Sequence, residues 1–382
     1  MTRVDVAPDL LRWAVERAGW SDETVDQRAP RLEAWLTGTR PTLKQLEKFA
    51  HDTHTPLGLL FLREPPDEQI PIPDLRTMGN ARLRRPSADL LDTIYQCQSR
   101  QDWYQDYTVE HGYAELEFVG SASVETPPEL VADEVRGRLE FGLGERGVFA
   151  SWEDARRRLI DRIEAIGVLV MVNGVVGSNT HRRLRPEEFR GFALADRHAP
   201  LIFVNGADTK AAQIFTLVHE LGHVWLGESA LSDAAMNSRN GHRAELWCNK
   251  VAAEVLVPIA ALRRDYRGEP IVEEFERLAR RYRVSTLVVV KRLYDAGFLQ
   301  WDHFDRLYAD EQARVVEIIA ARGQAPGGNY YYTQPLRLSR QFASAVIAST
   351  FEGGTSFREA YRLLGTKKHD TFINLAAELG MS

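Results

Sequence analysis

The sequence predicts a mostly helical α+β protein, and three observations support this prediction. Most segments with regular apolar spacing are long enough for helices, and several begin at a residue that can cap a helix, such as Ser21 and Ser87. Short apolar runs typical of buried strands are confined to the middle of the chain, at 168–172, 189–195 and 200–204. The length of 382 residues favours two or three domains.

Composition and charge exclude several classes of protein. The formal net charge of −6 gives no overall attraction to nucleic acid or to an anionic membrane. Cys97 and Cys248 are too few and too far apart for a disulfide framework or a thiolate zinc site. The first residues lack the apolar core of a signal peptide, and no uninterrupted apolar run approaches the ~20 residues that span a bilayer. We therefore expect a cytoplasmic protein without a membrane partner.

Residues 1–64 are predicted to form a compact helical domain. Its helices are indicated by apolar stripes, by Ser21 as a cap and by Pro41-Thr42 at the start of a later helix. The order of these helices resembles an Xre-type helix-turn-helix domain, with 31–35 in the place of the recognition helix.

Arg31, Arg40 and Lys44 are the candidate DNA contacts of this domain. A DNA-binding domain usually presents a basic face, because contacts to phosphate provide much of the affinity. The charge of 1–64 is instead balanced, with nine Lys and Arg residues against ten Asp and Glu residues. A helix-turn-helix scaffold that serves protein contacts is therefore an equal alternative to DNA binding.

Residues 65–150 are predicted to form a Pro-rich linker followed by a helical segment. The prolines of 64–74 exclude a regular helix or a central strand there. Ser87 is expected to cap a long helix that reaches about His111, and a second helix is expected at 128–141. The basic run at 75–86 is a weak candidate for phosphate contact, although such a run is usually only solvated, and 114–150 shows no pattern of catalytic or binding residues.

Residues 151–300 are predicted to hold the functional core. Ser151 begins a helix before the first strand, and the strand segments 189–195 and 200–204 flank a tight turn. A basic helix-turn-helix-like pair ends the core, with Ser285 as the cap of its second helix. Residues 301–382 are expected to form a C-terminal helical region, with helices near 302–322, 335–350 and 356–379.

The segment 215–227 carries the pattern that indicates chemistry. His219 and His223 stand four residues apart, so on a helix both imidazoles lie on one face and can converge on one metal ion. Glu220 is rotated by about 100° from His219 and could accept a proton from a water molecule at the metal without being a ligand. A catalytic zinc site needs these two nitrogen donors, the carboxylate and one more ligand.

The alternative is an ordinary buried helix whose histidines hydrogen-bond to the backbone. Apolar residues surround the motif and predict that its helix is largely buried: Ile214, Leu217, Val218, Leu221, Val224, Trp225 and Leu226. Burial of two histidines and a glutamate without partners costs several kcal/mol, and a bound metal ion would offset that cost. The context therefore favours a zinc site.

A third ligand is expected from another helix, and two carboxylates qualify. Glu245 and Glu254 both lie in 244–257, which has helical periodicity and ends before Pro258. They are nine residues apart, so they point to nearly opposite faces and only one can reach the two histidines. Spacing alone leaves the choice open.

These segments resemble the ImmA/IrrE family of zinc metallopeptidases. That family carries H-E-x-x-H on one helix and E-x-x-A-N-x-F-A-A-E-L-L-M-P on the next, and 245–258 reads E-L-W-C-N-K-V-A-A-E-V-L-V-P. The similarity covers 151–299. Four residues differ from the family pattern, and all four stay small or apolar: Cys248, Val251, Val255 and Val257.

The resemblance implies roles for the residues of both motifs. It implies that Glu245 is the third ligand to Zn²⁺, beside His219 and His223, and that Glu254 is the second choice. It also implies that Glu220 is the general base that deprotonates water.

The fold that the resemblance implies is a zincin-like metallopeptidase core over 151–300, with the helix-turn-helix-like pair at its end. In zincins an extended substrate adds to a sheet edge beside the metal, so one of the strands 189–195 and 200–204 is the expected edge. An oxyanion donor is also expected, and His242 and Tyr266 are weak candidates for that role.

The function that the resemblance implies is that of a zinc-dependent endopeptidase. Members of the family often act on transcriptional repressors, so we expect one specific regulatory protein as substrate, a repressor or a toxin encoded nearby. The expected setting is phage-derived, a stress response or a toxin–antitoxin locus, and DNA is a further candidate partner. The alternative is a non-catalytic DNA- or protein-binding regulator, or an antitoxin, that keeps the zincin fold for partner contacts. A pure binding module has no need of Glu220, so the intact set of ligands and base favours the enzyme.

Overall fold

The computed structural model describes residues 2–75, 86–146, 149–232, 242–322 and 330–381, and of 319–322 and 330–333 it describes the backbone alone. The chain forms two compact units, which are Met1–Pro71 with Ala81–Tyr95 and Ile72–Asn80 with Gln96–Ser382. The division of the sequence at 64, 150 and 300 stays a prediction.

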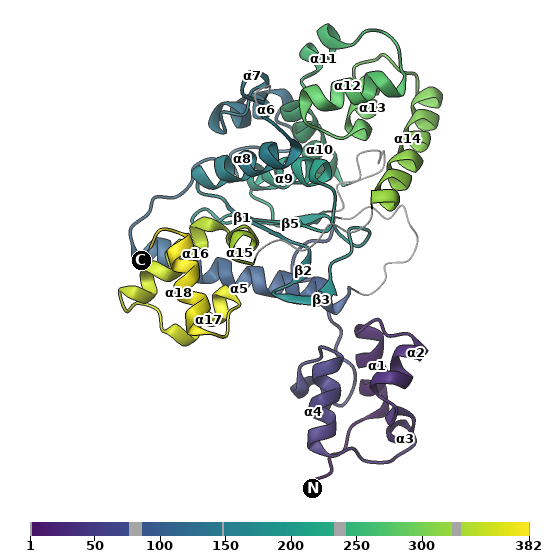
Figure 1. Ribbon diagram of the computed structural model, residues 1–382, viewed down its shortest axis with the longest axis vertical. Helices are drawn as coiled ribbons and strands as arrows, with labels where there is room; N and C mark the ends of the chain where they lie inside the picture. The colour runs from purple at the N-terminus through teal and green to yellow at the C-terminus, as the bar shows by residue number, and fades with distance from the viewer. Residues whose placement is uncertain (1, 76–85, 147–148, 233–241, 323–329, 382) are drawn as a thin grey trace. The chain divides into compact units, whose positions relative to one another are not determined.

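The first unit contains a bundle of short helices around an apolar interior (purple in Figure 1). Its elements are α1 (Pro8–Arg17), α2 (Asp22–Arg28), α3 (Leu32–Leu36), α4 (Leu43–Asp52) and the 3₁₀ helix η1 (Leu57–Phe61). Ser21 caps α2 as predicted, and Thr42 forms a capping box with Gln45 at the start of α4. Aliphatic and aromatic side chains such as Leu10 and Phe49 fill the interior. The unit therefore has a hydrophobic core of its own.

The second unit is built on a four-stranded mixed sheet. In order across the sheet, the strands are β1 (Leu169–Asn173), β5 (Leu201–Asn205), β4 (Gly191–Leu194) and β6 (Ala230–Ser232). β1 and β5 are parallel, and the other pairs are antiparallel. Every residue of the four strands is buried. β4 lies in a predicted strand segment, and β1 and β5 each match one to within a residue at either end.

Three strands form where the sequence predicts none. β6 has only three residues, and its extended conformation depends on pairing with β4. β2 (Val175–Val176) and β3 (Asn179–Arg183) form a separate antiparallel pair. β2 and β6 are too short to show an apolar alternation and β3 is polar throughout, so only their partners reveal these strands.

Helices cover both faces of the sheet (Figure 1). On one face lie α8 (Trp152–Ala165) and α9 (Lys210–Leu226), with α10 (Arg243–Leu256) beside α9 and α6 (Pro128–Arg138) packed on α10. On the other face α15 (Tyr330–Leu338) contacts β1, and the part of α5 (Ala88–Glu110) from Gln96 onward crosses below the sheet. From this part of α5, the side-chain amide of Gln101 donates to the carbonyl oxygens of Leu194 and Ala199.

The remaining helices complete the second unit. They are α7 (Leu143–Arg146), α11 (Ile259–Asp265), α12 (Val272–Tyr282), α13 (Thr286–Asp295), α14 (Trp301–Arg322), α16 (Arg340–Phe351), α17 (Phe357–Leu364) and α18 (His369–Glu378). Ser151 and Ser285 cap α8 and α13 as predicted. The prediction of a mostly helical α+β fold is confirmed.

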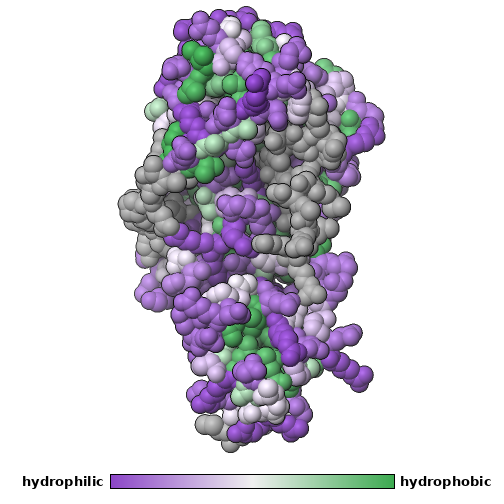
Figure 2. Space-filling view, turned by 90° about the vertical axis from the view of Figure 1, so that its right-hand side faces the viewer, coloured by the Kyte–Doolittle hydropathy of each residue, from purple (hydrophilic) through white to green (hydrophobic). Residues whose placement is uncertain are grey.

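The surface and the helix lengths bear on membrane contact. The face shown in Figure 2 is dominated by hydrophilic residues. Within the described ranges, no helix combines the length and the apolar character needed to cross a bilayer.

Candidate metal centre

Local features at the ends and in the middle of α9 place the helix that carries the histidines. Thr209 caps its first turn by accepting a backbone amide hydrogen at 3.2 Å, and Gly227 ends it with a φ of 70°, which favours glycine. A Cβ on Gly222 would lie 3.1 Å from Cys248 Sγ, so this glycine lets α9 approach α10 closely. The close approach brings the two histidines near the first turn of α10.

Three side chains converge between α9 and α10. His219 and His223 are fully buried, and Glu245 is 3% exposed. Glu245 Oε2 lies 3.2 Å from His219 Nε2, and Glu245 Oε1 lies 3.0 Å from His223 Nε2. The ligand atoms of the three side chains all lie within 4.8 Å of one another, so one ion could contact all of them.

Hydrogen bonding prepares His219 for a metal. Its Nδ1 lies 3.0 Å from Asn249 Oδ1, which can only accept, so in the neutral imidazole that binds a metal Nδ1 carries the proton and Nε2 has the lone pair. His219 Nε2 is buried and, although it is 3.2 Å from Glu245, it makes no hydrogen bond with any described residue. A buried nitrogen atom without a hydrogen bond is rare unless it binds a ligand. Two imidazoles and one carboxylate are a ligand set of catalytic zinc, so the residues present fit that metal.

The pKa values of the three residues show how their charges are coupled. Burial lowers the pKa of His219, but the Glu245 carboxylate outweighs burial and raises that pKa to about 9. For His223 burial prevails, and its pKa is lowered. Burial alone would raise the pKa of Glu245, but the two imidazoles outweigh it and hold that pKa well below its usual range. Glu245 is therefore ionised at neutral pH, as a metal ligand must be.

Glu220 lies beside these three residues and has a carboxylate oxygen without a partner. Its side chain is fully buried, Oε1 makes no hydrogen bond within the described part of the chain, and Oε2 lies 3.5 Å from Ser232 Oγ. Burial raises the pKa of Glu220 to about 8. Strand β4 passes directly over this carboxylate, because a Cβ on Gly191 would lie 2.8 Å from Glu220 Oε1. Only glycine fits at that position.

Glu254, the second choice as ligand, lies outside this group of residues. Its carboxylate forms an ion pair with Arg292 of α13. Arg136 donates to the carbonyl oxygen of Glu254 at 2.6 Å, and Arg146 and Arg292 donate to the carbonyl oxygens that follow it. These arginines satisfy the last carbonyl groups of α10 and oppose the negative end of its dipole. Of the two carboxylates on α10, only Glu245 reaches the histidines.

Comparison with known proteins gives two family matches. Residues 163–294 match the Peptidase M78 family, described as the IrrE N-terminal-like domain. This stretch is similar to a zinc metallopeptidase domain. Residues 338–378 match a domain of unknown function, DUF8813. No curated protein matches the chain.

The first match, called the M78-like domain below, contains the sheet, both histidines, Glu220 and Glu245. It supports the resemblance to the ImmA/IrrE family and a metallopeptidase-like function. The helices of the first unit lie outside both matches, so the helix-turn-helix assignment stays a prediction.

The sheet edge of the M78-like domain differs from the one predicted. Both predicted strands are interior, because β5 lies between β1 and β4, and β4 lies between β5 and β6. The edge strands are β1 and β6, and the outer side of β6 pairs with the Pro-rich linker. The amide of Leu231 donates to the carbonyl oxygen of Pro73 at 2.9 Å, and the amide of Leu75 donates to the carbonyl oxygen of Leu231 at 3.1 Å. The expectation of an edge at 189–195 or 200–204 is therefore wrong.

Sequence reasoning missed three residues that shape the site: Gly191, Ser232 and Asn249. Asn249 follows Glu245 by four residues, so helical spacing places it on the ligand face and could have identified it. Gly191 and Ser232 are opposite one another where β4 pairs with β6. That pairing joins segments far apart in the chain, and no local pattern indicates it.

Within the described residues, neither of the two oxyanion candidates is seen to contact a metal ligand. His242 is exposed and precedes the first turn of α10. Tyr266 packs its ring against Phe298, with ring centroids 4.8 Å apart. Neither residue is assigned the role.

The candidate DNA contacts are all exposed on the first unit. Arg31 precedes α3, Lys44 lies in the first turn of α4, and Arg40 forms an ion pair with Asp5 at 2.9 Å. An exposed ion pair contributes little free energy, so Arg40 could exchange Asp5 for a phosphate at small cost. A role in DNA binding stays a prediction for all three.

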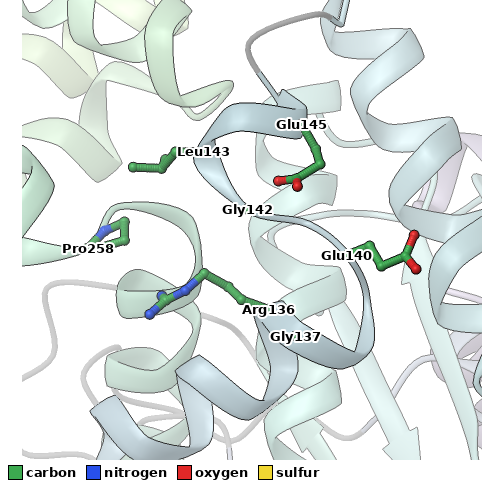
Figure 3. Close-up of a pocket in the computed structure, with 7 residues that line it drawn as sticks. All are labelled: Arg136, Gly137, Glu140, Gly142, Leu143, Glu145 and Pro258. Carbon is green, nitrogen blue, oxygen red and sulfur yellow. The ribbon is translucent and has the colours of Figure 1, made fainter.

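A pocket of about 510 Å³ lies at the C-terminal end of α10, away from Glu245 in its first turn (Figure 3). Its lining residues are Arg136, Gly137, Glu140, Gly142, Leu143, Glu145 and Pro258. The guanidinium group of Arg136 already pairs with Asp133 and with the carbonyl oxygen of Glu254. None of the lining residues belongs to the metal site, and we assign the pocket no chemistry.

Proposed function

We propose that the chain is a zinc-dependent endopeptidase that cleaves one specific regulatory protein. The observation that carries the proposal is the buried convergence of His219, His223 and Glu245, with a fully buried Glu220 whose Oε1 has no partner among the described residues. The match of 163–294 to the Peptidase M78 family supports the same chemistry.

Each residue has one part in the reaction. His219, His223 and Glu245 would hold Zn²⁺, and Glu220 accepts the proton of the attacking water and later returns a proton to the leaving amine. A bound Zn²⁺ would polarise the scissile carbonyl group and lower the pKa of water. Asn249 keeps His219 in the tautomer that presents Nε2.

The substrate class follows from the family resemblance and from the sheet. A transcriptional repressor or a toxin encoded nearby is the proposed substrate, in a phage-derived, stress-response or toxin–antitoxin setting. A substrate segment in extended conformation would pair with the outer edge of β6 through backbone hydrogen bonds. That edge carries Pro73 to Leu75, so the substrate must compete with the linker for Leu231.

The test combines cleavage of the neighbouring regulator with zinc content. Glu220→Gln keeps the size of the side chain and removes the base, so cleavage should fall by about 100-fold or more while zinc is retained. Glu228→Gln is the matched control, because Glu228 is an exposed carboxylate just beyond the same helix. It should leave both measurements unchanged.

The same experiment separates the enzyme from the alternative. A Glu220→Gln protein that produces the full response in cells without cleaving the regulator would rule out the enzymatic proposal and favour a regulator or antitoxin that acts by binding. A variant that still cleaves at the rate of the parent would overturn the role of Glu220 as the base. General substrates such as casein decide nothing, because a narrow specificity would prevent their cleavage as well.

A further inference from the structure

Ser232 of β6 is fully buried among the polar atoms of the metal site. Its Oγ lies 3.1 Å from Glu245 Oε1, 3.3 Å from His223 Nε2 and 3.5 Å from Glu220 Oε2. The other two residues of β6 are apolar. A buried hydroxyl costs free energy unless it is hydrogen-bonded, so its value at this position lies in the bonds that it makes.

The backbone holds Ser232 in place from both sides. In the pairing of β4 with β6 it is opposite Gly191, the glycine that lies against Glu220. On the outer side, the neighbouring Leu231 is bonded through its amide and its carbonyl to Pro73 and Leu75. The hydroxyl group is therefore positioned by strand pairing, before any ligand binds.

The count of hydrogen-bond donors shows what this hydroxyl supplies. Two groups can donate to Glu245 Oε1, the Nε2 of His223 at 3.0 Å and the Oγ of Ser232 at 3.1 Å. A histidine nitrogen that binds a metal uses its lone pair and has no hydrogen to donate. With both histidines bound to a metal, Ser232 is the side-chain donor to Glu245 that remains within the described part of the chain.

We propose that Ser232 is a positioning residue of the metal site, which donates to Glu245 and holds that carboxylate in the orientation in which it binds the metal. Because its Oγ lies between Glu245 and Glu220, it also keeps the ligand carboxylate apart from the base. The inference rests on the metal site of the proposed function, but its test requires no proteolysis.

The experiment measures zinc affinity of the full-length protein by competition with a chromophoric chelator. Ser232→Ala should bind zinc about 10–100-fold more weakly, the usual loss when an outer partner of a metal ligand is removed. Ser232→Thr restores the hydroxyl and should bind within about threefold of the parent, whereas Ser232→Val, which matches threonine in shape, should bind as weakly as alanine. Ser229→Ala is the control, because Ser229 Oγ accepts the amide of Ala195 instead.

Each outcome bears on one claim. Equal zinc affinity in the threonine and valine variants, with unchanged melting temperatures, would overturn the role of Ser232 and leave the zinc site intact. A parent protein that binds no zinc would overturn the proposed function itself. If Ser232→Ala unfolds, the threonine and valine pair still decides, because the two side chains differ only by a hydroxyl in place of a methyl group.

Discussion

The N-terminal bundle and the M78-like domain both bury polar groups, but they satisfy them differently. In the bundle, the buried Arg17 donates to both carboxylate oxygens of Glu68, at 3.0 and 2.8 Å, and to the carbonyl oxygen of His54 at 2.7 Å. In the M78-like domain, His219 Nε2 and Glu220 Oε1 are buried without a hydrogen bond to any described residue.

This difference separates polar groups that hold a fold together from polar groups that await a ligand. A buried charge with a complete set of partners stabilises one arrangement of the chain, whereas a buried atom without a partner costs free energy until something binds it. The M78-like domain contains both kinds, the unpartnered atoms on α9 and a fully paired carboxylate on α10. Glu254 of α10 is paired with Arg292, as Glu68 is with Arg17, and Glu245 of the same helix faces His219.

The largest expected effect comes from removing each of the two carboxylates of α10 in turn. Glu245→Ala should weaken zinc binding by more than about 100-fold, because a ligand is lost rather than an outer partner. Glu254→Ala should leave zinc affinity within about threefold of the parent but destabilise the domain by about 3 kcal/mol, because it removes the main partner of the buried Arg292, which keeps only a longer ion pair with Asp295 at 3.6 Å. Chelator competition and urea unfolding measure the two effects.

The opposite result would contradict the roles assigned to Glu245 and Glu254. Loss of zinc in Glu254→Ala, with zinc retained in Glu245→Ala, would move the third ligand to Glu254. A loss of zinc in both variants together with unfolding would mean that the contributions of α10 to stability and to metal binding cannot be separated.

The next effect is expected in the bundle and should not reach the metal. Glu68→Ala removes the main partner of Arg17 and should destabilise the first unit by about 2 kcal/mol, less than the loss at Glu254 because the Glu68 side chain is more exposed than that of Glu254. Hydrogen exchange of peptides from α1 and α4 should become faster, while zinc affinity stays at the value of the parent. Unchanged exchange would show that the ion pair contributes nothing to the bundle.

The sequence predicts those parts of the molecule that depend on local chemistry. Ser21, Ser87, Ser151 and Ser285 each accept the amide hydrogen of the residue three positions later, so a short stretch of sequence indicates where these helices begin. The pair His219 and His223 is indicated for the same reason, because a spacing of four residues is enough to place both on one face.

The remainder of the site depends on contacts between distant segments. β6 is extended because it pairs with β4 on one side and with 73–75 on the other, and no three-residue pattern carries that information. Gly191 and Ser232 enter the site only through that register. The choice between Glu245 and Glu254 depends on how α10 is turned, and the ion pair of Glu254 with Arg292 lies on the side away from the histidines.

A smaller effect is expected at the edge of the sheet, where the linker and a substrate would compete. Leu75→Pro removes the amide that donates to Leu231, so the linker should bind β6 less firmly and kcat/KM for the protein substrate should rise about fivefold, the value of one hydrogen bond of about 1 kcal/mol. Gln69→Pro, outside the paired stretch, should leave kcat/KM unchanged. A lower kcat/KM at full zinc content would show that 73–75 supports substrate binding.

The smallest effect is expected for DNA binding. The buried charged residue of the bundle, Arg17, is already paired with Glu68 and is therefore not available to contact phosphate. With nine basic against ten acidic residues in 1–64 and a formal net charge of −6 overall, the full-length protein should bind random duplex DNA weakly, with a Kd of about 10–100 µM at physiological salt. Replacement of Arg31, Arg40 and Lys44 together by Gln should change this Kd by no more than about threefold, since three exposed cations contribute little at that salt concentration. Fluorescence anisotropy over a series of salt concentrations measures both quantities.

The matched control for DNA is a second triple variant, in which three other cations of the bundle are replaced by Gln: Arg12, Arg28 and Lys48. Arg12 and Lys48 are paired with acids on their own helices, and Arg28 lies over the ring of Trp20. If the parent binds DNA tightly with a steep salt dependence, and only the first variant loses that binding, the bundle reads DNA through the face that carries the start of α3. In that case the exposed charges of the bundle, rather than its buried ones, would carry its function. The difference between paired and unpaired polar groups would then describe only the interiors of the bundle and of the M78-like domain.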